Sequence, residues 1–408
     1  MHLLFSKKNI TVIFIVIISI VAVFDYPGKD NLYLYFIFLI FFSIMALNVL
    51  LKKRLFLKVD KIGGSIAILF LLMWILGQFI GHINGNDLTA MIRNFAGMLL
   101  FIVYLGMSHS EISKDTIIRL IFYSSVAFMI YNLLIIFNHS ISSNPAEIFK
   151  FDIIRTYYNV TFIPIVAFLN VATISYIFGN QYISSKTHNY FNKNWKSKLY
   201  IFTALLVLIF YMSKAIYAII FISVFFISLL LAYRHRNLWA IFKLCTLFLI
   251  FSLIISYMFP YNILDLVKAQ LELERVGVRS IQASMILNDF HLFGSGIGGT
   301  LLDGYSRDAL GYGFELSFFS VLHKYGIFSF LIFLPYLYMG IYSIYGVLYM
   351  SDKIDYVIAL SMTISIVIFS YGNPLLFHPI VVFYTLLVLL LLRRKKNINC
   401  ARIEKCVE

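Results

Sequence analysis

The sequence predicts an all-helical integral membrane protein with many spanning helices and one long polar loop. Of its 408 residues, 61% are hydrophobic and only 13% are charged, whereas a soluble domain carries roughly a quarter charged residues. The apolar residues occur in long runs, and a soluble fold of this length could not hide so much apolar surface from water. We therefore expect the chain to form one polytopic membrane domain over residues 1–408.

About twelve apolar stretches are candidate spans, because each crossing needs about 20 mostly apolar residues. The first stretch follows Lys7 and Lys8 and lacks a small-residue cleavage pattern, so it is expected to stay as an uncleaved span. No internal repeat and no low-complexity linker divides the chain. The candidate spans are 10–24, 32–51, 62–80, 95–107, 116–137, 162–178, 199–212, 215–233, 240–259, 327–349, 356–371 and 376–392.

Lys and Arg residues gather in alternate connections between these spans, as the positive-inside rule requires. If the N-terminus is cytoplasmic, more than two thirds of the 33 basic residues fall in inner segments, and most of the 19 acidic residues fall in outer ones. Both termini are then cytoplasmic, and residues 393–408 form a basic cytoplasmic tail. The net charge of +14 thus reflects topology, and no nucleic-acid partner is expected.

The positions of the cysteines argue against a disulfide or a metal site, and the apolar centres of the spans argue against an ion-coupled carrier. Cys245 lies in an apolar segment, while Cys400 and Cys406 lie in the tail, so we predict neither a disulfide nor a metal site. The spans hold almost no charged residues near their centres, where an ion-coupled carrier needs proton or sodium relays. Any chemistry is therefore expected at the outer face.

Two outer connections are long, 139–161 and 260–314, and long loops of this kind are usually functional. Within the second, segment 263–289 has helical spacing and is predicted to form one or two amphipathic helices. Arg275 and Arg279 are four residues apart and would project from one helix face. The planar fork of arginine matches phosphate oxygens, although solvated ion pairs with neighbouring acids would explain the same residues.

Other polar residues are predicted to lie near this loop at the outer face. Lys214 stands between two apolar stretches with no loop around it, so it either lines a cavity or extends to the lipid head groups. Arg93 and Arg307 are further basic candidates for substrate binding. The glycine-rich run 294–299 lacks the Gly-Lys-Ser/Thr of a Walker loop and is predicted to be a tight turn. His291, just before it, is interpreted as structural rather than catalytic, and it is kept as a candidate substrate contact.

Segment 279–298, RSIQASMILNDFHLFGSGIG, resembles the core of the O-antigen polymerase/ligase family. In that family an Arg of the outer loop begins a helix that ends in a Gly-x-Gly turn. The segment that begins at Glu315 looks like the family segment before the next span, and Ser213-Lys214 stands where many members have Ser-Arg. The Asn373-Pro374 turn is also similar, but the likeness covers only a small part of the chain.

The resemblance implies a glycosyltransferase of the GT-C-like architecture in the bacterial inner membrane, acting at the periplasmic surface on a glycan linked to undecaprenyl diphosphate. Arg275 and Arg279 would bind the leaving diphosphate, and Lys214 and Arg93 would line the same cavity. Glu315 would be a general base or would orient an arginine. No metal and no cofactor are implied. The implied partners are the lipid-linked glycan donor and acceptor, membrane lipid and a chain-length regulator.

Departures from the family pattern favour a polymerase over a ligase and leave two other classes open. Ligases of the family carry a His where this chain has Glu315, which favours the polymerase. Lys in place of Arg at position 214 removes bidentate phosphate binding and bears only on the role of that residue. The other classes are a flippase or secondary transporter for polyprenyl-linked oligosaccharides, and a non-catalytic assembly partner. Charges along a central pathway would favour the transporter.

Overall fold

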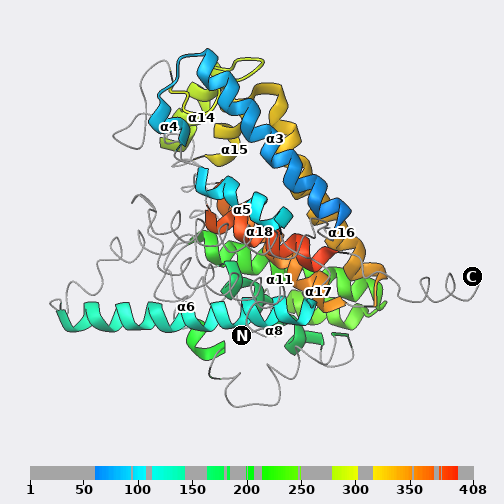
Figure 1. Cartoon of the computed structure of the whole chain (residues 1–408). Coiled ribbons are helices and arrows are strands. Elements are labelled where there is room, and N and C mark those ends of the chain that lie inside the picture. Colours follow the sequence, from blue (N-terminus) through cyan, green and yellow to red (C-terminus); the bar gives the residue numbers. More distant parts are fainter. Residues whose placement is uncertain are drawn as a thin grey trace, which may run out of the picture.

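The computed structural model describes residues 60–92, 95–106, 113–142, 163–178, 182–183, 199, 201–205, 214–246, 249, 278–301, 316–351, 353–371, 376–377 and 379–393. This part of the chain consists of helices and turns and contains no strand. Its principal helices are α3 (Lys61–Ile83), α4 (Leu88–Ile92), α5 (Phe95–Gly106), α6 (Lys114–Ser142), α8 (Ile163–Phe178), α11 (Lys214–Arg234), α14 (Val278–Asn288), α15 (Ser317–Tyr325), the 3-10 turn η2 (Gly326–Phe328), α16 (Ser329–Tyr349), α17 (Lys353–Tyr371) and α18 (Pro379–Leu392), shown in Figure 1.

Several of these helices are long and apolar enough to cross a membrane. Four segments meet this condition, and two shorter helices are equally apolar; all six overlap predicted spans. The four are Lys61–Ile83, Ile216–Arg234, Ser317–Tyr349 and Lys353–Tyr371, and the two shorter ones are Ile163–Phe178 and Val381–Leu392. The all-helical, membrane-embedded character is thus confirmed, while the count of about twelve spans stays a prediction. Predicted spans 10–24 and 32–51 lie outside the described residues, as do large parts of 199–212 and 240–259.

The α3 and α16 helices show why these segments belong in lipid. On α3 the buried face includes Ala67, Phe70 and Met73, yet the opposite face is apolar as well. That exposed stripe, with helical spacing, is Ile68, Leu72, Ile75 and Phe79. The corresponding stripe on α16 is Phe330, Leu334, Leu337 and Ile341. A helix that is apolar all round is either wholly buried or spans a membrane, so the exposed stripes are expected to face lipid.

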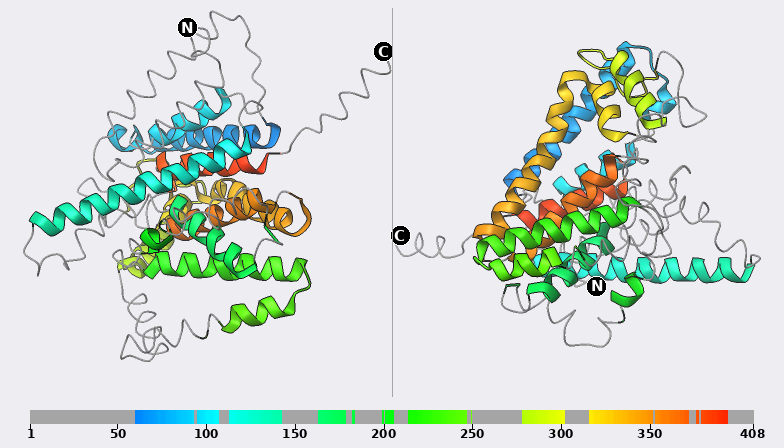
Figure 2. Two further views of the ribbon diagram at one scale, coloured as in Figure 1. Left: turned by 90° about the horizontal axis from the view of Figure 1, so that it is seen from below. Right: turned by 180° about the vertical axis from the view of Figure 1, so that it is seen from behind.

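The centre of the bundle is formed by α8, α17 and α18. α17 packs against α8, α11, α16 and α18, and α18 also packs against α5. The pair α3 and α16 lies on one side of this centre (Figures 1 and 2). Aromatic packing joins α3 to α5 and to α16, because the ring of Phe70 stacks on Phe101 with centroids 4.7 Å apart and meets the edge of Tyr336 at 6.0 Å.

One end of the bundle, here called the basic end, gathers charged residues from several helix termini. The Lys114 ammonium lies 3.1 Å from the Asp355 carboxylate, and both side chains are about nine-tenths buried. Arg234, at the end of α11, donates from Nη1 to the carbonyl oxygens of Val347 (2.7 Å) and Met350 (3.0 Å). These contacts satisfy carbonyl groups that the last turn of α16 leaves without helical partners.

His235 is a second polar link at the basic end. Lys353 Nζ donates to its Nε2 at 3.0 Å, and the ring of Tyr182 meets it edge-on at 4.3 Å. Burial, with the charges of Lys353 and Arg234, holds the pKa of His235 below its ordinary value. The lowered pKa favours the neutral imidazole, whose Nε2 can accept a hydrogen bond from the Lys353 ammonium.

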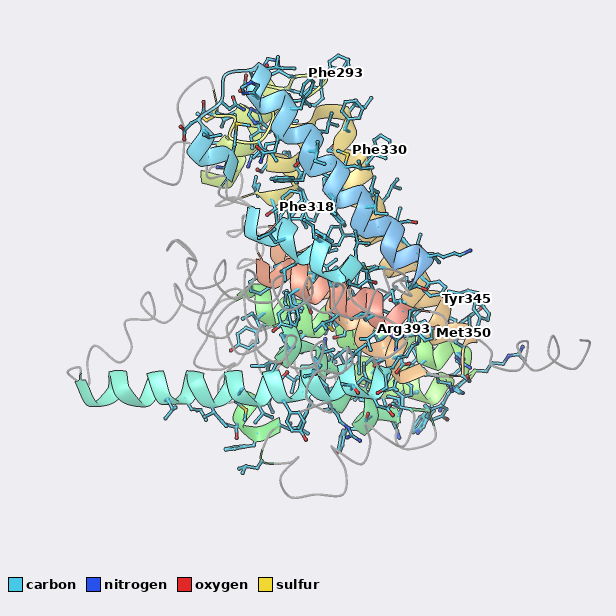
Figure 3. The ribbon with its side chains drawn as sticks, viewed as in Figure 1. Phe293, Phe318, Phe330, Tyr345, Met350 and Arg393 are labelled. Atoms are coloured by element: carbon cyan, nitrogen blue, oxygen red, sulfur yellow. The ribbon has the colours of Figure 1, made fainter. Side chains whose placement is uncertain are left out.

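The relative directions of the helices agree with the predicted alternation of inner and outer connections. Besides the contacts just described, Arg393, just after α18, lies within electrostatic reach of Asp60 at the start of α3 and of Asp355. All of these helix termini were predicted to face the same side. In Figure 3, Arg393 and Met350 lie at this end of the molecule, and Phe293 lies at the other.

Candidate functional site

At the end opposite the basic end, short helices and a glycine-rich turn form a polar cap. The polar cap comprises α4, α14, residues 289–301, α15 and η2, and it lies against the C-terminal end of α3 (Figure 1). It contains the part of the predicted functional loop that the structure describes. α14 falls within the amphipathic segment predicted at 263–289, and residues 263–277 lie outside the described part.

The glycine-rich run forms the tight turn that its sequence predicts. Gly294, Gly296 and Gly298 have φ angles of 81°, 80° and 83°, in the left-handed region that favours glycine. A side chain on Gly296 would overlap the backbone of Gly81 in α3. Glycine is therefore needed at position 296 both for the bend and for the close approach to α3.

Backbone hydrogen bonds fix the turn between α3 and α15. The amide of Ile297 donates to the carbonyl of Gly77 at 2.9 Å, and the amide of Gly296 donates to the carbonyl of Lys324 at 2.9 Å. The Asn86 side chain donates to the carbonyl oxygens of Ser295 (2.9 Å) and Ile297 (3.0 Å). Because its backbone groups are engaged by the protein, this turn is not arranged as a phosphate-binding loop.

A buried polar chain runs beneath the turn, from Asp289 to Ser295. His323 is fully buried, and its Nε2 lies 3.1 Å from Oδ2 of Asp289. Its Nδ1 lies 2.9 Å from the hydroxyl of Ser295. Since an ionised carboxylate only accepts hydrogen bonds, we assign the imidazole proton to Nε2, and Nδ1 then accepts from Ser295.

These three residues have the types of a hydrolase triad but not its accessibility. A catalytic imidazole must pass a proton between the nucleophile and a leaving group in the substrate, and His323 has no exposed surface. The Ser295 hydroxyl also lies 3.2 Å from the carbonyl oxygen of His323, a second contact between the turn and α15. The chain Ser295–His323–Asp289 is therefore a structural link between the turn, α15 and the end of α14.

The backbone also brings the segments of two predicted catalytic residues together. Gln282 is fully buried, and its Oε1 accepts from the backbone amide of Leu316 at 3.3 Å. Gln282 lies one helical turn after Arg279 in α14, and Leu316 directly follows Glu315. The segments that carry Arg279 and Glu315 are thus joined in the polar cap.

The predicted site residues are described to different extents. Arg279 is the second residue of α14 and Lys214 is the first residue of α11, and for both the structure describes the backbone. His291 lies in the polar cap with its side chain 61% exposed. The predicted site residues outside the described part are Arg93, Arg275, Arg307 and Glu315.

The sequence alone did not connect Asp289 with His323. The two are 34 residues apart and lie on separate elements, and the distance between them depends on the turn that joins those elements. One signal was available, because Ser317, Ser320 and His323 recur at helical spacing in α15 and are all buried. A polar stripe on an otherwise apolar helix indicates a buried polar contact.

No protein-family model matches the chain, and no curated protein is similar to it at a significant level. The site is accordingly interpreted from its own residues and geometry.

Proposed function

We propose that this protein is an O-antigen type polysaccharide polymerase that joins undecaprenyl-diphosphate-linked repeat units at the periplasmic face of the bacterial inner membrane. The observation that supports this function is the polar cap, where the helix that carries Arg279 is tied through Gln282 to the residue after Glu315. The cap lies opposite the basic end, and the positive-inside rule assigns the basic end to the cytoplasm. On this assignment both termini are cytoplasmic and the cap is periplasmic.

In the proposed reaction an acceptor hydroxyl attacks the anomeric carbon of the donor glycan, and undecaprenyl diphosphate leaves. Arg275 and Arg279 bind the diphosphate and stabilise the negative charge that grows as the sugar–phosphate bond breaks. Lys214 and Arg93 add positive charge from the membrane side, and Arg307 and His291 contact the glycan. In the proposal, Glu315 accepts the acceptor proton or orients an arginine. Because guanidinium groups supply the charge, the proposal requires no metal.

The position of buried charges favours this proposal over an ion-coupled transporter. Among the described residues, the buried Asp, Glu, Lys and Arg side chains are Lys114, Asp289 and Asp355. Each lies at or next to a helix terminus, whereas a coupled carrier needs titratable groups near the middle of the membrane. The buried charged side chains of the described part therefore lie near its two ends.

Deleting the gene tests the reaction class. If the protein is the polymerase, the ladder of lipopolysaccharide lengths collapses to the lipid core carrying a single repeat unit. Loss of a ligase would leave the bare core, with long chains retained on the lipid carrier, and an unchanged ladder would contradict both activities.

A variant at Arg279 tests the role of the polar cap within that reaction. Arg279→Ala should lower the rate of chain elongation by about 100- to 1,000-fold, the usual cost of losing one donor to a developing negative charge. Arg279→Lys keeps the charge but loses the bidentate fork, so it should restore only part of the rate. Lys243→Ala, at an exposed lysine after α11, is the control. Full elongation by Arg279→Ala at normal protein levels would indicate a scaffold.

A further inference from the structure

The Asp289 carboxylate has two oxygens in different environments. Its side chain is only 8% exposed, and Oδ2 is held by the buried His323 at 3.1 Å. Oδ1 accepts no hydrogen bond from any described residue, although it is buried. Nε2 of the exposed His291 imidazole lies 3.4 Å from Oδ1, in a contact that is not a hydrogen bond. A buried carboxylate oxygen without a hydrogen bond is uncommon in a native protein and calls for an explanation.

His291 lies beside a carboxylate that the protein holds in a fixed position. Asp289 is fixed from behind by His323, and His323 is fixed in turn by Ser295 at 2.9 Å. The carboxylate therefore points toward His291 before any substrate arrives. If His291 Nε2–H donates to Asp289 Oδ1, the other ring nitrogen, Nδ1, is left as an unprotonated acceptor on the solvent side. A carboxylate that orients an imidazole in this way is a recurring arrangement in general-base catalysis.

Two other charged groups lie near His291. The Asp289 carboxylate is 3.4 Å from its Nε2. Lys324 is a cationic group that acts on the neighbouring His323.

The surroundings of His291 fit a substrate that arrives from the membrane. Phe290, Leu292 and Phe293 are 41%, 57% and 61% exposed, so apolar side chains flank the imidazole. α14 has 11 residues and is about 16 Å long. Arg279 and His291 therefore belong to opposite ends of one helix.

We propose that His291 is the general base of the glycosyl transfer, that Asp289 is its positioning residue, and that His323 and Ser295 hold Asp289 in place. The inference rests on the proposed function and assigns the proton transfer to a residue other than Glu315. The acceptor O–H proton moves to His291 Nδ1 as the acceptor oxygen forms its bond to the donor anomeric carbon. The bond from that carbon to the diphosphate oxygen breaks, and its electron pair leaves with undecaprenyl diphosphate.

Chemical rescue tests this assignment in membranes that contain the full chain and undecaprenyl-diphosphate-linked repeat units. His291→Ala should lower the elongation rate by about 100- to 10,000-fold. Because the native side chain is largely exposed, added imidazole can enter its place and should restore part of the rate. His82→Ala removes another exposed histidine from the same end of the molecule and should leave elongation unchanged.

The positioning role of Asp289 is tested by combining substitutions. Asp289→Asn alone should slow elongation, yet it should add little further loss in the His291→Ala background, because the two residues act as one unit. If the wild-type chain does not elongate glycans, the proposed function itself fails. If the wild type elongates and His291→Ala keeps its rate, or loses it without rescue by imidazole, the general-base assignment is overturned.

Discussion

Lys114 and Asp355 form a buried ion pair, with side chains 9% and 8% exposed. The two charges are 3.1 Å apart, and Lys114 also lies over the ring of Tyr356, 5.4 Å from its centroid. Taking both charges out of water costs free energy that their attraction roughly offsets, so the intact pair adds little net stability. Its role is in specificity, because it fixes the start of α6 against the start of α17.

Replacing one residue of this pair should lower the stability of the protein far more than replacing both. Asp355→Ala leaves the Lys114 ammonium buried without its carboxylate and should lower the free energy of unfolding by about 3–5 kcal/mol. The double variant Lys114→Met with Asp355→Leu should recover most of that loss. Thermal unfolding of the purified protein in detergent measures both, with the exposed Lys61→Met as control. A single variant as stable as the wild type would show that Asp355 does not neutralise Lys114.

At the scale of an element, the atoms around a glycine determine what an added side chain costs. Gly85 and Gly296 have similar positive φ angles of 71° and 80°. An added side chain at Gly85 would meet nothing within 4 Å, whereas one at Gly296 would overlap the backbone of Gly81. The two glycines therefore separate the cost of the backbone conformation from the cost of lost packing.

Alanine at these two positions should give different losses of stability. Gly85→Ala should cost about 1 kcal/mol, the left-handed penalty of a residue with a Cβ atom. Gly296→Ala should cost about 2–4 kcal/mol, because the added methyl group has the same backbone penalty and also displaces the turn from α3. Thermal unfolding in detergent compares them, and equal losses would mean that the turn does not pack tightly on α3. The Gly296 variant should also slow elongation, since the turn positions Asp289 through Ser295 and His323.

The elements that could be predicted from the sequence are those set by local pattern. The long apolar runs place α3, α11, α16 and α17, because hydropathy alone selects a spanning helix. The tight turn follows from its glycines, and α14 follows from its amphipathic spacing. The short helices α4 and α15 were not predicted, because helices this short depend on the packing around them. The contact between Asp289 and His323 depends on tertiary structure, so the local sequence pattern cannot predict it.

At the scale of the molecule, the described residues place their polar contacts at two ends. The basic end holds the termini of α6, α11, α16 and α17 together through ion pairs and hydrogen bonds. The polar cap holds the candidate catalytic segments at the other end. A lipid-linked substrate that has crossed the membrane can meet the cap only if the cap is periplasmic. Orientation is therefore a requirement of the proposed function as well as of the positive-inside rule.

Cysteine labelling tests this orientation with two sites of nearly equal exposure. In a variant whose Cys245, Cys400 and Cys406 are replaced by serine, Phe293→Cys places a thiol in the polar cap, and Trp239→Cys places one after α11, near the basic end. The native side chains are 61% and 64% exposed, so access to the reagent differs chiefly by the side of the membrane.

A membrane-impermeant maleimide should label position 293 in cells whose outer membrane has been permeabilised, and position 239 only after the inner membrane is opened. The positive-inside argument predicts this result because most basic residues lie in the segments assigned to the cytoplasm. The reverse pattern would place Arg279 and His291 in the cytoplasm, where a periplasmic glycan cannot reach them. It would therefore contradict the polymerase even if every helix contact described above were retained.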